Sequence, residues 1–263
     1  MNTTDLVSIG SWLLLSLYVW LLPHLALTHK VSHANVEHYC TTGVTSKCLN
    51  SYEETFNVSN QILSCGCGEG IFGHPECLRS SWGFTVSHYI STPTGTILMG
   101  ILSFVPVLRM WRFSMKIKQN FENCKSDYRV YLLPVSISIF IMTWIIFLFV
   151  TVCTHSILHS FFVAMFILAA ISTYGTIYSM HITMDREKHE LADKMLARYV
   201  AQFSLMTVLT ICLFLLSAYT YQLGLHDIDH APWFFECVAI SFGFFIPLLD
   251  VVTENSARLT DVL

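Results

Sequence analysis

The chain has 263 residues, of which 54% are hydrophobic and only 12% are charged, against roughly 25% charged residues in ordinary soluble domains. A single soluble core of this size could not bury so much apolar surface, so the composition excludes a soluble globular protein. The net charge of −4 is small, and without a basic patch the chain shows no sign of a nucleic-acid partner.

Long tracts without Asp, Glu, Lys or Arg predict the fold class. They run over 6–29, 80–108, 130–184 and 199–226. A bilayer core requires about 20 consecutive apolar residues per helix, and the longest tract holds enough for two helices. We expect an all-α, polytopic six-helix transmembrane bundle that forms one domain over 1–263. The expected spans are 7–28, 86–108, 130–153, 157–181, 199–222 and 232–252.

The first expected span, 7–28, has an alternative interpretation as a cleaved signal peptide. A signal peptide begins with a basic segment and ends at a small-residue cleavage site. Here only Asp5 precedes the apolar stretch, and no clear cleavage site comes before Pro23. We therefore expect an uncleaved first helix.

The distribution of Lys and Arg predicts the orientation, because positive residues concentrate in cytoplasmic segments. Eleven of the 14 basic residues lie between the second and third spans, between the fourth and fifth spans, or in the C-terminal tail. Only Lys30, Lys47 and Arg79 lie on the opposite side. Both termini are therefore expected in the cytoplasm.

The segment 29–85 then forms a cysteine-rich extracytoplasmic loop after the first helix. It contains the glycosylation sequon at Asn57 and five disulfide candidates, Cys40, Cys48, Cys65, Cys67 and Cys77. Disulfides and N-glycans both indicate the secretory compartment. The sixth partner is Cys153 or Cys237, or one thiol stays free. A zinc site is the alternative, although the spacing lacks a CxxC pair.

Candidate functional residues are polar side chains on the expected extracytoplasmic side. Glu236 lies inside the last span, either as a buried acid with a partner or as a hydrated group near the helix N-terminus. His155 and His159 are four residues apart on one helix face, and His226 and His230 lie at the same membrane level. With Glu236 they could form a metal site or a pH-sensitive lock; we favour the simpler interpretation of polar residues at a helix rim, and expect no metal.

Asp250, near the other end of the last span, is expected at the membrane interface. Serine, threonine and glycine residues inside the spans, among them Gly100, Gly175 and Gly243, are typical of helix–helix packing in bilayers. Neither a GxSxG elbow nor a nucleotide-binding motif occurs in the sequence. We therefore expect no catalytic residue and no cofactor.

Three stretches resemble the DRAM family (damage-regulated autophagy modulators). One is Pro93-Thr94-Gly95 with Arg109 and Arg112. The second runs from His159 to Gly175 and Tyr178. The third runs from Phe235-Glu236-Cys237 through Ser241-Phe242-Gly243-Phe244 and Asp250 to Ser256-Ala257-Arg258-Leu259. The same superfamily includes a GPI-anchor lipid-remodelling protein of the Golgi and a yeast plasma-membrane lipid regulator. The loop 29–85 departs from DRAM proteins, whose first loop is shorter and poorer in cysteine, and is more like the GPI-remodelling branch.

This resemblance implies a non-enzymatic membrane protein that acts in autophagy or membrane-lipid homeostasis, in the secretory or endolysosomal pathway or the plasma membrane. Its expected partners are membrane lipids, with a homo-oligomer or another membrane protein as a further candidate. The resemblance also suggests Glu236 and His159 as a buried polar pair. Two alternatives stay open: participation in GPI-anchor fatty-acid remodelling in the Golgi or endoplasmic reticulum, with or without catalysis, and a channel or transporter subunit.

Overall fold

The computed structural model describes residues 3–28, 85–90, 93–120, 127–150, 156–183, 191–225 and 230–251. In these ranges the chain is helical and contains no strand. Six helices are long and apolar enough to cross a membrane, as predicted, which makes this chain a multi-pass integral membrane protein. The helices are α1 (Thr3–Thr28), α4 (Val86–Tyr89), α5 (Pro93–Asn120), α6 (Arg129–Phe149), α7 (Ser156–Thr183), α8 (Leu191–Gln222) and α9 (Ala231–Phe245), followed by the 3₁₀ turn η4 (Ile246–Leu248).

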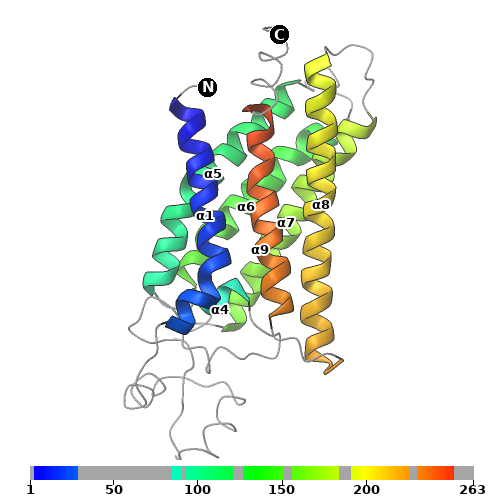
Figure 1. Ribbon diagram of the computed structural model, residues 1–263. Coiled ribbons are helices and arrows are strands. Elements are labelled where there is room, and N and C mark those ends of the chain that lie inside the picture. Colours follow the sequence, from blue (N-terminus) through cyan, green and yellow to red (C-terminus); the bar gives the residue numbers. More distant parts are fainter. Residues whose placement is uncertain are drawn as a thin grey trace, which may run out of the picture.

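The six long helices form a closed ring in chain order. Each packs against the next, and α9 returns to pack against α1. Successive helices run in opposite directions, so that α1 begins at the same end of the bundle at which α9 finishes (Figure 1). The short helix α4 lies at the other end, against α1 and α9. We call this the α4 end of the bundle.

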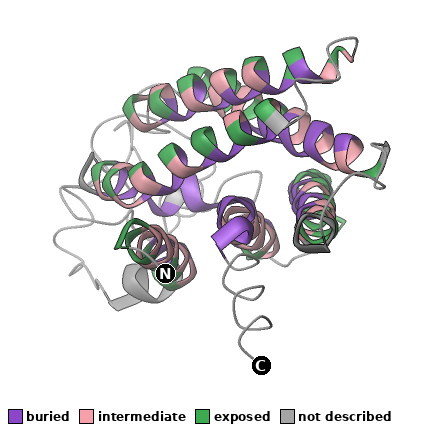
Figure 2. Ribbon diagram, turned by 90° about the horizontal axis from the view of Figure 1, so that it is seen from above, coloured by how far each residue is buried: buried purple, intermediate pink, exposed green. Residues whose placement is uncertain are grey.

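The bundle is apolar on its outer surface, as a bilayer requires. Figure 2 shows the exposed faces of the helices turned outward and the buried faces turned inward. Large aliphatic and aromatic side chains such as Ile101, Phe104 and Leu216 are more than half exposed. Buried positions include hydroxylated residues, and the Thr173 hydroxyl donates to Ser136 Oγ (3.0 Å) between α7 and α6. This contact confirms the expected role of small hydroxylated side chains in joining helices.

The expected packing role of the glycines is confirmed only in part. A Cβ added at Gly100 would lie 3.2 Å from Leu148 Cδ1, so α5 and α6 approach closely there. A Cβ at Gly243 would meet side chains of α7 and α8 at ordinary contact distance. Nothing lies within 4 Å of the corresponding position at Gly175, so for that residue the prediction is wrong.

The second span differs most from its expected bounds. Residues 86–89 do not belong to α5, which begins at Pro93; they form the separate helix α4. Proline is well suited to the first turn of a helix, where its missing N–H costs nothing. At its other end α5 continues to Asn120 and is about 42 Å long, more than the hydrocarbon thickness of about 30 Å. Its last turns therefore extend beyond the bilayer core or the helix tilts.

The first helix contributes to the bundle core through its buried side chains and its tryptophans. Leu15, Val19 and Leu22 are fully buried. The Trp12 indole N–H donates to the Ser241 carbonyl (2.9 Å) and the Trp20 indole N–H to Ser241 Oγ (3.0 Å). These contacts join α1 to α9.

An acid-sensitive contact precedes α6. Asp127 accepts hydrogen bonds from the backbone N–H and the side chain of Arg129, and Arg129 Nη1 also donates to the Ser179 carbonyl of α7 (3.1 Å). The hydrogen bonds from the Arg129 side chain lower the pKa of Asp127 below its ordinary value. The contact therefore stabilises the fold above the unfolded-state pKa of about 3.9 and is lost as the pH falls through the lowered value.

Asp127→Ala is accordingly expected to lower the melting temperature near neutral pH and to have progressively less effect below about pH 4. Melting curves of detergent-solubilised wild type and variant between pH 2.5 and pH 7 measure this difference. Asp5→Ala, at the start of α1, controls for the loss of an acid at the same end of the bundle. A difference that is constant over the whole pH range would contradict the assignment.

Candidate ligand cavity

A cavity lies inside the ring of helices. It is lined by residues of α4 to α9, among them Val86, Met99, Phe166, Ala170, Ile211 and Glu236. The space open to the centres of water molecules is about 60 Å³, and the empty volume including its mouth is about 680 Å³. We call this space the bundle cavity. Its walls are almost entirely apolar.

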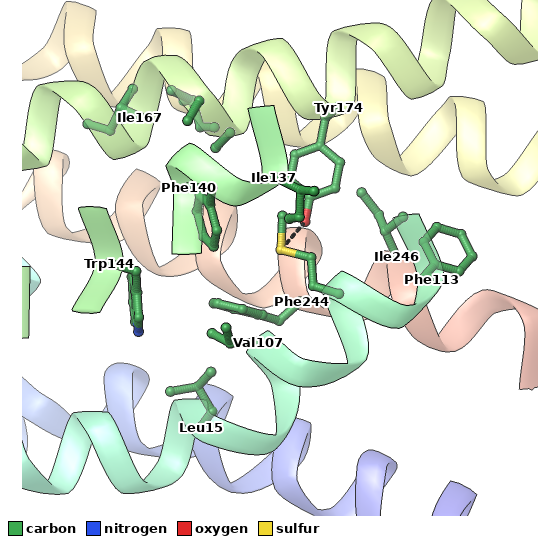
Figure 3. Packing of buried hydrophobic residues seen from close by; sticks show 14 of the residues in the cluster. Leu15, Val107, Phe113, Ile137, Phe140, Trp144, Ile167, Tyr174, Phe244 and Ile246 are labelled. Carbon is green, nitrogen blue, oxygen red and sulfur yellow. Dashed lines mark hydrogen bonds between the residues drawn. The ribbon is translucent and has the colours of Figure 1, made fainter. Parts of the chain in front are cut away.

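One wall of the bundle cavity is a cluster of aromatic rings. Phe140, Trp144 and Phe147 follow one another at helical spacing on one face of α6. Their rings lie 5.5 to 6.4 Å from those of Phe166 on α7 and Phe244 on α9 in edge-to-face or tilted arrangements. Phe140, Trp144 and Phe244 are seen side by side in Figure 3. Rings packed in this way are rigid and favour a hydrocarbon over water as occupant.

At the inner end of the cavity, the end away from α4, a hydrogen bond compensates for a proline. In an α-helix the Gly243 carbonyl would accept from the N–H of residue 247, but Pro247 has no N–H. The Tyr174 hydroxyl donates to this carbonyl instead, at 2.6 Å. Its oxygen also lies 3.5 Å from Met110 Sδ, the contact drawn as a dashed line in Figure 3. The helix also changes here, because α9 ends at Phe245 and the 3₁₀ turn η4, which contains Pro247, follows.

Glu236 lies on the wall of the cavity towards the α4 end. Its Oε2 accepts a hydrogen bond (2.6 Å) from the backbone N–H of Val86, the first residue of α4. This hydrogen bond fixes α4 against α9. The second attachment of α4 is a hydrogen bond between the Tyr89 hydroxyl and His230 Nδ1 (3.3 Å). Among the described residues no Lys, Arg or His forms an ion pair with Glu236. Glu236 is therefore a carboxylate on the wall of an apolar cavity, with one donor among the described residues.

The histidine candidates do not converge in the described part of the chain. His159 is buried, with Nδ1 at 2.5 Å from the Val150 carbonyl and its ring against Phe147. Within the described ranges no hydrogen bond joins His159 to Glu236. The two residues expected to pair contact different groups, Val150 for His159 and Val86 for Glu236. His230 is exposed and packs against Trp233. Over these ranges no group of three or more His, Cys, Asp or Glu side chains could hold a metal ion.

Several predicted residues lie outside the described ranges: His155, His226, Asn57, and the cysteines Cys40, Cys48, Cys65, Cys67, Cys77 and Cys153. Cys237, one of the expected sixth disulfide partners, is a free buried thiol that donates to the Val19 carbonyl (3.3 Å). Cys237 therefore sits in the contact between α9 and α1, while its candidate disulfide partners lie outside the described ranges.

An ion cluster at the end of the bundle opposite α4 connects α5 to α9. Asp250 is buried and accepts from Arg109 Nη2 (2.6 Å) and Lys116 Nζ (3.4 Å). Arg109 Nε also donates to the Pro247 carbonyl (3.0 Å). Asp250 was predicted at the membrane interface, but neither of its partners was predicted. The available signal was an acid near the end of the last span, at the same membrane level as the basic residues that follow the second span.

Comparison of the chain with protein-family models, with curated proteins and with solved structures gives no match. The geometry of the site therefore has to suggest its function directly. An apolar, aromatic-walled cavity inside a membrane bundle can bind hydrocarbon and exclude water. A carboxylate on its wall can orient a bound molecule.

Proposed function

We propose that this chain is a non-enzymatic multi-pass membrane protein of the DRAM type that acts in membrane-lipid homeostasis or autophagy by taking the hydrocarbon chain of a lipid into the bundle cavity. The bundle cavity is the observation that carries the proposal. It lies inside a membrane-spanning helix ring, and its lining consists mainly of Phe, Trp, Ile, Met and Ala side chains.

The resemblance to the DRAM family supports the same conclusion. Its third stretch begins at Phe235 in α9 and continues through η4 to Asp250, and its last residues, Ser256 to Leu259, lie outside the described ranges. Glu236 and Gly243 from this stretch lie on the cavity wall, and Asp250 holds the end of the helix through Arg109. The residues of the resemblance therefore both line the cavity and position the helix that forms one side of it.

Photo-crosslinking with a lipid that carries a diazirine and an alkyne on one alkyl chain tests the proposal. Ala170 is buried on α7 and lines the cavity, so Ala170→Phe places a ring inside it. We expect this variant to lose most of the labelling of cavity peptides. In cells lacking the protein, it should also fail to restore autophagic flux or membrane-lipid composition where wild type does.

The matched control is Ala164→Phe, the same substitution on the exposed face of the same helix. Its ring adds apolar surface towards the bilayer, so labelling of cavity peptides should equal that of wild type. Equal labelling of cavity peptides in Ala170→Phe and wild type, with both proteins monodisperse, would rule out the cavity as the lipid site. A change confined to the acyl chains of GPI anchors would favour the remodelling alternative.

A further inference from the structure

The Glu236 carboxylate has unused capacity to accept hydrogen bonds. A carboxylate offers about four lone-pair sites, and among the described residues only the Val86 N–H occupies one of them. Glu236 is partly exposed, and it lines the bundle cavity. Acids within membrane spans are costly unless they face a partner or a water-filled space. A donor on a bound molecule would supply the missing partner.

The remaining polar groups of the cavity are already satisfied within the bundle. The Tyr174 hydroxyl donates to the Gly243 carbonyl, and the Thr207 hydroxyl donates to the Phe203 carbonyl of its own helix (2.8 Å). The Trp144 indole N–H donates to Ser103 Oγ (3.1 Å), and the other lining side chains are apolar. The cavity therefore has a polar end at Glu236 and an apolar end at Tyr174, which is the polarity of an amphiphile.

The dimensions of the cavity select the shape of that amphiphile. Glu236 and Gly243 are seven residues apart on α9, a distance of about 10 Å along the helix axis. A space of about 60 Å³ for water centres drawn out over that length is about as wide as one alkyl chain.

The charge at the polar end selects the head group. A phosphate or carboxylate head would place a second negative charge against Glu236 in surroundings of low dielectric constant, with no cation paired to Glu236 in the described part of the chain. Like charges at this separation repel strongly. An ammonium or a hydroxyl would instead donate a hydrogen bond to the carboxylate, and bonds of this type to an ionised acceptor are the stronger ones.

We propose that the bundle cavity binds a single-chain amphiphile whose head donates hydrogen bonds to Glu236 and carries no negative charge, that is, a long-chain amine or alcohol. The head lies against Glu236 at the α4 end, and the chain runs along the aromatic wall towards Tyr174. This inference rests on the proposed function, because it requires that the cavity take a hydrocarbon chain.

Purified full-length protein in detergent micelles tests the inference with three photoreactive, clickable probes that have the same chain length. They are a sphingoid base as the amine, a monoacylglycerol as the alcohol and a fatty acid as the anion. The amine or the alcohol should label cavity peptides of the wild type at least about tenfold more strongly than the fatty acid, the factor that corresponds to one hydrogen bond to a charged group.

Two substitutions distinguish the amine from the alcohol. Glu236→Gln keeps an oxygen for the Val86 N–H but removes the charge, so it should reduce labelling by an amine about tenfold and labelling by an alcohol much less. Glu236→Leu should abolish the preference for either head group. Asp5→Asn, which removes an acid at the opposite end of the bundle, should leave labelling unchanged.

The outcomes separate this inference from the function on which it rests. Equal labelling by all three probes, unaffected by Glu236→Leu but lost in Ala170→Phe, would overturn the head-group assignment and leave lipid binding intact. Stronger labelling by the fatty acid would overturn the assignment as well. Absence of labelled cavity peptides with every probe would overturn both. If the Glu236 variants do not purify as monodisperse protein, a competition experiment on the wild type replaces them. Unlabelled amine or alcohol should displace the photoreactive probe at a lower concentration than unlabelled fatty acid does. Displacement at equal concentrations would overturn the assignment.

Discussion

Asp250→Ala should lower the free energy of unfolding by about 3–5 kcal/mol, the range found when one partner of a buried ion pair is removed. The substitution leaves the Arg109 guanidinium, only 22% exposed, without its carboxylate. It also releases Lys116 from the same acid. The hydrogen bond from Arg109 to the Pro247 carbonyl remains, but both ionic contacts between α5 and Asp250 are lost. Thermal and denaturant unfolding of the protein in detergent measures the loss.

Replacing both residues by apolar ones separates two contributions to the free energy of unfolding: the cost of leaving Arg109 buried without its partner, and the stabilisation that the ion pair itself provides. Arg109→Met with Asp250→Leu should recover most of the stability, since buried ion pairs are often replaceable by apolar residues of similar volume. Arg112→Ala, three residues along α5 and exposed, is the control and should change the free energy of unfolding by no more than about 0.5 kcal/mol. A double variant less stable than Asp250→Ala would show that the pair itself is required.

Tyr174→Phe is expected to destabilise the bundle by about 1–3 kcal/mol, the cost of leaving a buried acceptor unsatisfied. The Tyr174 hydroxyl donates a hydrogen bond to the Gly243 carbonyl. It replaces the backbone N–H that Pro247 lacks. We also expect water to enter the inner end of the bundle cavity and bind this carbonyl. Unfolding curves measure the stability, and labelling with the alkyl probe measures the effect on the cavity.

Two further variants test whether the lost hydrogen bond to the Gly243 carbonyl is the cause of the destabilisation. Tyr178→Phe removes a hydroxyl one turn further along α7, for which the described part of the structure shows no hydrogen bond, and should be nearly neutral. In a Pro247→Ala background the backbone regains an N–H that can serve Gly243, so Tyr174→Phe should cost less there than in the wild type. An equal cost in both backgrounds would contradict the link between Tyr174 and the proline.

The spans could be predicted because a bilayer excludes charged side chains, so each span appears in the sequence as a long stretch without Asp, Glu, Lys or Arg. The same criterion failed at residues 86–92, since the tract from Ser80 to Leu108 contains no charge at which to divide it. Pro93 was the usable signal, as a residue suited to the first turn of a helix. Separating α4 from α5 matters for the site, because Val86 becomes the donor to Glu236.

The contacts of the site were less predictable than its helices. Glu236 was identified as an intramembrane acid, but its partner is a backbone N–H, which any residue type except proline provides. Asp250 and Arg109 are 141 positions apart, and only the ring order of the helices brings them together. The need for a donor at Gly243 could have been inferred from Pro247 four residues later, but the identity of Tyr174 could not.

Depth-resolved labelling tests the lipid cavity most directly. Two probes with the same head and chain, one with its diazirine next to the head and one with it near the chain end, are crosslinked to wild-type protein and the labelled residues are mapped by mass spectrometry. The head-proximal probe should label α4 and α9 around Val86 and Glu236, and the chain-end probe should label α7 and α9 around Tyr174 and Gly243. Labelling by both probes only at outward-facing residues such as Ile101 and Leu216 would show that lipid merely surrounds the bundle and does not enter it.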